Sequence, residues 1–200
     1  MTNPAVFICC LALTPLTAFA QTLPEKARER GGSARTVIDI DSPIARPAEL
    51  MSESDLVVNG RVTSVTIRLN EDQTDVVTEY TIAPIHALKQ RRIDTVAVPG
   101  AATKIVVWQF GGTLVTADGL HLSTSVNIFP ESESFRVGEE VLLFLTSNAD
   151  TKTYRFTGGA FGAYRIQNGL ASLMTERAAK RRGDQPVSAS VFFADLLRAR

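Results

Sequence analysis

The amino-acid sequence predicts a mainly β fold, a curled sheet that forms a barrel or a sandwich, with a short helix before it and a helix at the C-terminus. Many short runs of alternating or continuously apolar residues predict the strands. Pairs containing Gly or Pro separate these runs and predict the turns. Near the C-terminus the apolar spacing changes to that of a helix.

The N-terminus predicts a secretion signal over residues 1–20. Residues 4–20 carry no charge, are mostly apolar and end in Ala18-Phe19-Ala20, a small–x–small cleavage pattern. The segment is shorter than the roughly 20 residues of a membrane span, and Pro15 interrupts it; a short buried helix and an uncleaved anchor are the alternatives. We therefore expect an exported protein, periplasmic or extracellular, whose mature chain begins at Gln21. Both cysteines of the chain lie inside the expected signal.

Residues 21–46 predict a flexible, solvated arm because they are rich in charge, Gly, Ser and Pro. The domain proper is expected to begin at Pro47, which suits the first position of a short helix through Ser52, where a missing amide hydrogen has no cost. Residues 47–200 are then a single β-barrel domain with a C-terminal helix. No later stretch is apolar and long enough for a stable membrane span.

The first two strands form the clearest pattern. Apolar alternation begins at Leu56 and shifts its parity after Val62, which predicts a β-bulge near residues 63–64. A turn at residues 70–73 leads to a second strand, in which Pro84 limits regular pairing.

Later elements follow from the same signals. Further strands are expected at residues 96–98, 105–115, 120–128, 141–146, 154–157 and 163–167. The C-terminal helix is expected at residues 188–198, with an apolar stripe formed by Ala189, Phe192, Phe193, Leu196 and Leu197. That stripe requires a sheet surface to cover.

Three segments carry a resemblance to a known family. They are Ser54-Asp55-Leu56-Val57-Val58-Asn59-Gly60-Arg61-Val62, then Thr78-Glu79-Tyr80-Thr81-Ile82 with Leu88-Lys89, then Phe135-Arg136-Val137-Gly138-Glu139-Glu140-Val141-Leu142-Leu143-Phe144-Leu145. Together they resemble a group of exported bacterial proteins of unknown function and, more distantly, the OB barrel of netrins and tissue inhibitors of metalloproteases.

The resemblance covers roughly residues 50–167 and implies a partly open, five-stranded OB-like barrel. In that barrel Gly60 permits the sharp coil of the first strand, and Gly138 permits the turn before a buried strand. The resemblance carries no function across, because those inhibitors reach the zinc of their target with an N-terminal cysteine and the expected mature chain has none.

Residues suited to catalysis or metal binding are sparse. His86 and His121, the two histidines, lie on different expected strands and in no recognisable motif. A hydrolase built around either histidine is therefore the alternative hypothesis to a non-catalytic module. Glu71, Asp72 and Asp75 share a loop, but their spacing matches no calcium loop. We expect neither a metal nor another cofactor.

The candidate ligand or partner surface combines aromatic and basic residues, for which a packed strand face and a solvated loop are the first interpretations. Trp108 and Phe110 share one strand face; we expect the C-terminal helix to cover it, and the alternative is an exposed aromatic platform for a ligand. Lys89, Arg91 and Arg92 lie in an expected basic loop beyond the second strand.

A formal net charge of zero and expected export argue against nucleic acid. A second basic run, residues 180–182, is interpreted as a solvated loop. The sequence therefore predicts an exported, non-catalytic binding or interaction module for an envelope or extracellular protein or ligand.

Overall fold

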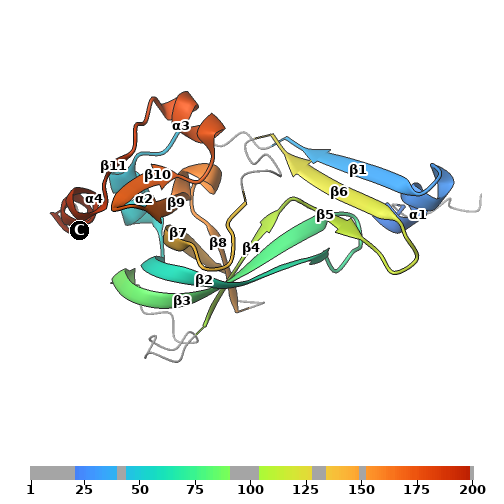
Figure 1. The fold of residues 1–200 in the computed structure, drawn as a ribbon, viewed down its shortest axis with the longest axis horizontal. Coiled ribbons are helices and arrows are strands. Elements are labelled where there is room, and N and C mark those ends of the chain that lie inside the picture. Colours follow the sequence, from blue (N-terminus) through green and yellow to red (C-terminus); the bar gives the residue numbers. More distant parts are fainter. Residues whose placement is uncertain (1–20, 40–43, 91–103, 128–133, 149–151, 199–200) are drawn as a thin grey trace, which may run out of the picture.

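A computed structural model describes residues 21–39, 44–90, 104–127, 134–148 and 152–198 (Figure 1). The fold is mainly β and partly barrel-like, with helices near both ends, which confirms the predicted fold class. The helices are α1 (Leu23–Glu29), α2 (Pro47–Glu53), α3 (Glu176–Arg182) and α4 (Ala189–Arg198). The strands are β1 (Ser33–Ile38), β2 (Leu56–Leu69), β3 (Val76–Gln90), β4 (Ile105–Phe110), β5 (Gly112–Val115), β6 (His121–Val126), β7 (Glu140–Asn148), β8 (Thr153–Phe156), β9 (Ala163–Gln167), β10 (Leu170–Leu173) and β11 (Val187–Ser188).

The barrel is a ring of strands in the spatial order β2, β3, β4, β8, β7, in which β7 pairs again with β2. Neighbours in the ring are antiparallel except β4 and β8, which are parallel and joined through one pair, Val107 with Tyr154. The ring is therefore partly open at that seam. Its interior holds fully buried side chains such as Tyr80, Ile82 and Leu145.

The β2–β3 hairpin bends where the sequence predicts. The pairing register shifts between Val62 and Ser64, which confirms the bulge, and shifts again between Asn59 and Gly60, opposite Pro84. A Cβ on Gly60 would lie only 2.5 Å from Cγ2 of Ile82 and 2.8 Å from the carbonyl oxygen of Ala83. Glycine is required here by close approach of the two strands.

Residues 23–38 are folded, so the solvated arm predicted over residues 21–46 is wrong for this part. The Thr22 side chain caps α1, whose Leu23 and Ala27 are buried. Strand β1 then pairs in parallel with β6, far along the chain. Only Leu23, Pro24 and Ala27 of the helix and Ala34 of the strand are buried, and these are too few for a clear periodic signal.

Strands β1, β6 and β5 form a small sheet, in that order, which packs against the far end of the β2–β3 hairpin (Figure 1). The predicted continuous strand 105–115 is divided at Gly111 and Gly112, whose φ angles are +117° and +135°. Positive φ is accessible to glycine at little cost, so the chain leaves the barrel there and enters the small sheet.

Strands β9, β10 and β11 extend the barrel sheet outward from β7. Helix α4 has almost the predicted bounds, and it contacts α2, β10 and β11 (Figure 1). The ring of its Phe192 lies 4.8 Å from that of Tyr164 on β9, whereas Leu197 is 53 % exposed. The prediction that this helix covers Trp108 on β4 is wrong, because the unpredicted β10 and β11 supply the nearer surface.

Two further predictions concern a strand at residues 96–98 and membrane spans. The strand expected at residues 96–98 lies outside the described residues. Within the part of the chain that the structure describes, no helix has the length and apolar character needed to cross a membrane.

Candidate ligand-binding cleft

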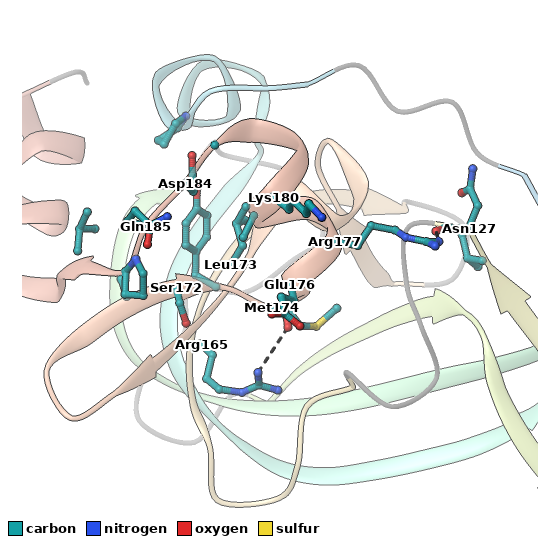
Figure 2. A pocket seen from close by; sticks show the side chains of 18 of the residues that line it. Asn127, Arg165, Ser172, Leu173, Met174, Glu176, Arg177, Lys180, Asp184 and Gln185 are labelled. Atoms are coloured by element: carbon teal, nitrogen blue, oxygen red, sulfur yellow. Dashed lines mark hydrogen bonds between the residues drawn. The ribbon is translucent and has the colours of Figure 1, made fainter.

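A broad cleft of about 1880 Å³ separates the small sheet from the extension of the barrel sheet. One wall is formed by β10, α3 and the segment from Gly183 to Val187, and the other by β1 and the end of β6. Figure 2 shows the lining residues of β10 and α3, with Arg177 directed toward Asn127 at the end of β6. The cleft is lined by apolar and charged side chains together.

Local sequence features place α3 beside the cleft. The Thr175 hydroxyl accepts a hydrogen bond from the amide of Ala178 at 3.1 Å and caps the helix start. Gly183 ends the helix with φ +77°, the conformation in which glycine is favoured. The exposed side of this short helix then carries Arg177 and Lys180 into the lining.

Cations outnumber acids in the lining: Arg35, Arg165, Arg177 and Lys180 against Glu176 and Asp184. Arg35 Nη2 donates to the hydroxyl oxygen of Ser125 at 3.0 Å, and Arg177 donates to the carbonyl oxygen of Asn127. Both acceptors are neutral. Among the described residues, no carboxylate forms an ion pair with Arg35, Arg177 or Lys180. Their positive charge therefore remains available to a ligand.

Arg165, by contrast, has a carboxylate partner and holds together the strands beside the cleft. Its Nε donates to Glu139 Oε2 at 3.1 Å, and its Nη atoms donate to the carbonyl oxygens of Met174 and Ser134. Its guanidinium also lies over the ring of Phe135, 5.7 Å from the centroid. These contacts tie β9 to the start of β7 and to the end of β10.

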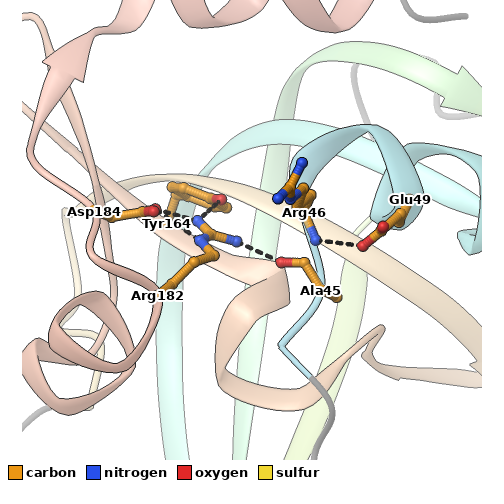
Figure 3. Close-up of polar contacts among 6 residues, drawn as sticks. All are labelled: Ala45, Arg46, Glu49, Tyr164, Arg182 and Asp184. Atoms are coloured by element: carbon orange, nitrogen blue, oxygen red, sulfur yellow. Dashed lines mark hydrogen bonds and ion pairs between the residues drawn. The ribbon is translucent and has the colours of Figure 1, made fainter.

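Arg182 also fixes the elements beside the cleft through hydrogen bonds of its buried side chain (Figure 3). Its side chain is 7 % exposed and donates to Asp184 Oδ2 at 2.8 Å, to the Ala45 carbonyl oxygen at 2.7 Å and to the Tyr164 hydroxyl oxygen. The interpretation of residues 180–182 as a solvated loop is therefore wrong, because these residues are the last turn of α3. The Arg182 side chain joins this helix to Tyr164 on β9 and to Ala45, which precedes α2.

Burial sets the ionisation of Tyr164. Removal from water disfavours the phenolate and raises the pKa of Tyr164 to about 12, against the opposing effect of the nearby Arg182 cation. The hydroxyl therefore stays protonated at neutral pH and accepts the hydrogen bond from the guanidinium.

Trp108, Phe110 and Lys89, the described residues of the predicted surface, do not line this cleft. Trp108 and Phe110, both on β4, are partly exposed and pack edge to face with ring centroids 5.2 Å apart. Lys89 lies in β3 rather than in a loop, and its Nζ donates to the carbonyl oxygens of Met51 and Ser52 at the end of α2. Arg91 and Arg92 lie outside the described residues.

The structure does not bring together the two histidines considered for catalysis. His86 is exposed on β3 and His121 is exposed on β6, in separate sheets. Within the described ranges, no group of three or more His, Cys, Asp or Glu side chains is arranged to hold a metal ion.

Sequence reasoning missed most of the cleft. Arg35 lay in the supposed arm, and Arg177 lay between expected elements. The basic run at Lys180 was the one signal in the sequence, and it gave no indication that β1 faces α3 across a gap.

Comparison with known proteins finds no family model that matches the chain, and no curated protein matches it. The class of this protein must therefore be argued from the geometry of the cleft.

Proposed function

We propose that this protein is an exported, non-catalytic binding module whose ligand occupies the cleft between the small sheet and α3. The observation that carries the proposal is the cleft lining, in which Arg35, Arg177 and Lys180 have no carboxylate partner among the described residues. Cations without a carboxylate partner attract an anionic ligand. The apolar surface beside them can bury part of that ligand.

The size of the cleft favours a segment of a larger partner. Pockets for small molecules usually enclose about 300–1,000 Å³, and this cleft is larger at about 1880 Å³ and open to solvent. A chain-like ligand fills such a groove better than a compact metabolite.

The walls are held before any ligand binds. Arg165 and Arg182 use hydrogen bonds to fix β9, β10 and α3 in place, so little conformational entropy is lost when a ligand enters. A preformed, rigid groove supports a role in binding.

Export is supported by the uncharged, apolar residues 4–20 and their small–x–small end. Mass spectrometry of the protein from its native cells tests this part. The expected mature N-terminus is Gln21, and recovery of residues 1–20 in the mature chain would contradict export by a cleaved signal.

Photo-cross-linking tests the cleft. A benzophenone amino acid is placed at Gln185, an exposed lining residue, and in a matched protein at Arg155, which is exposed on β8 outside the lining. Irradiation in the native cells is expected to give a defined adduct from Gln185 and not from Arg155. No adduct from Gln185, or the same adducts from both positions, would overturn the assignment of the cleft.

A further inference from the structure

Strand β1 is an edge of the small sheet, and one row of its backbone groups faces away from β6. The amide of His121 donates to the Gly32 carbonyl oxygen at 2.9 Å, and that of Asn127 donates to the Ile38 carbonyl oxygen at 3.2 Å. A parallel ladder uses every second residue, so the even-numbered residues of β1 bond to β6. The amide and carbonyl groups of Ser33, Arg35 and Val37 point outward.

This outward row is unpaired within the described residues, where no hydrogen bond involves those backbone groups. Edge strands are often protected by proline or a bulge, but β1 contains no proline and its register with β6 has no shift. Val37 is 66 % exposed. The edge therefore offers donors and acceptors to an added strand.

The same strand contributes to the cleft. The side chains of Arg35 and Val37 are part of the lining, and Arg177 and Lys180 face them from α3. A chain added to β1 would direct every second side chain toward this cationic side. Acidic side chains at those positions would meet three cations, whereas basic ones would be repelled.

We propose that the ligand is an extended acidic peptide segment of a partner protein, which adds to β1 as a fourth strand of the small sheet. This inference rests on the proposed function of the cleft and names the chemistry of its ligand. A second copy of this chain fits less well. Antiparallel pairing of two β1 edges around Arg35 would oppose two arginines, and like charges directly opposite each other are destabilising.

Labelled synthetic peptides test strand addition by fluorescence anisotropy with the full chain. The parent probe is four Thr-Glu repeats with blocked ends, and the charge control has Lys in place of Glu. Two further probes carry N-methyl groups on every Thr or on every Glu. Because only alternate residues of an added strand bond to β1, one methylated probe should bind like the parent and the other about tenfold or more weaker.

Several results would overturn the inference. They are failure of the parent probe to bind, equal binding of both methylated probes, and equal binding of the Lys control. Sedimentation of the protein alone is expected to show a monomer. A dimer that the Val37→Pro change dissociates would assign the edge to a second copy instead.

Protein variants locate the probe. Arg35→Gln is expected to weaken binding several-fold, while Arg155→Gln, a matched exposed arginine outside the lining, should not. Val37→Pro removes an outward amide and leaves the ladder to β6 intact, so circular dichroism should be unchanged while the probe is lost. Retained binding in both Arg35→Gln and Val37→Pro would exclude this edge.

The Gln185 cross-link separates the two proposals. An adduct that is a lipid or a glycan would overturn the peptide inference and leave the binding function of the cleft intact. Absence of any adduct would overturn the function itself.

Discussion

Replacement of Arg182 by Met tests whether the buried guanidinium holds the cleft wall. The variant keeps much of the side-chain length but loses hydrogen bonds to Asp184, Tyr164 and Ala45. Hydrogen bonds to charged groups contribute roughly 1.5–3 kcal/mol each, but Asp184 is 31 % exposed and regains hydration when Arg182 is removed. We therefore expect the free energy of unfolding to fall by about 3 kcal/mol.

The partner variant Asp184→Asn leaves the cation in place, still bonded to Tyr164 and Ala45, but without its counter-charge. Breaking a buried pair from one side costs roughly 3–5 kcal/mol, and the partial exposure of Asp184 places the expected loss at about 2 kcal/mol. In the double variant the two losses should not add, because the same interaction is removed twice. The expected coupling is on the order of 1–2 kcal/mol.

Urea unfolding monitored by circular dichroism measures all three variants. Arg198→Met is the control, because Arg198 pairs with Asp195 on the surface and is 80 % exposed. Exposed pairs contribute little, so this variant should behave as the wild type does. The reasoning fails if Arg182→Met costs no more than Arg198→Met, or if the Arg182 and Asp184 effects are additive.

Three other predictions follow from the fold. Gly60→Val should lower the free energy of unfolding by roughly 1–3 kcal/mol, because its Cβ would overlap β3; unchanged urea unfolding would disprove this contact. Burial raises the pKa of Tyr80 and of Tyr164 to about 12, whereas the unfolded chain titrates near 10, so the unfolded state loses protons first. The contribution of these two hydroxyls to the free energy of unfolding is fully present below pH 10 and is lost between pH 10 and 12, by about 3 kcal/mol for each tyrosine. Tyrosinate absorbance of the native protein that rises near pH 10 would contradict this. Truncation after Gln185 should leave the fluorescence of Trp108 unchanged, because α4 packs elsewhere, and a red shift would contradict the placement of that helix.

The barrel was predictable because its signals are local. A parity change after Val62 and the position of Pro84 were enough to predict the irregular pairing that the structure contains. Strands β7, β8 and β9 likewise lie within a few residues of their predicted bounds. Alternation and turn residues act over short distances, and sequence reasoning can detect them.

The cleft was not predictable, because it depends on long-range pairing. Nothing near Arg35 indicates that its strand aligns with β6, and the polar character of residues 21–46 favoured an arm. The same limit affected Trp108, whose predicted cover required knowledge of β10 and β11. Side chains on segments far apart in sequence meet only once the sheet topology is known.

The parallel pairing of β1 with β6 also has a kinetic consequence. Ser33 is synthesised long before its partner His121, and loop closure over such a separation is entropically costly. The small sheet should therefore form after the β2–β3 hairpin. Until β1 arrives, β6 presents an unpaired edge to other molecules. We expect aggregation during refolding to increase when β1 is slow to pair with β6.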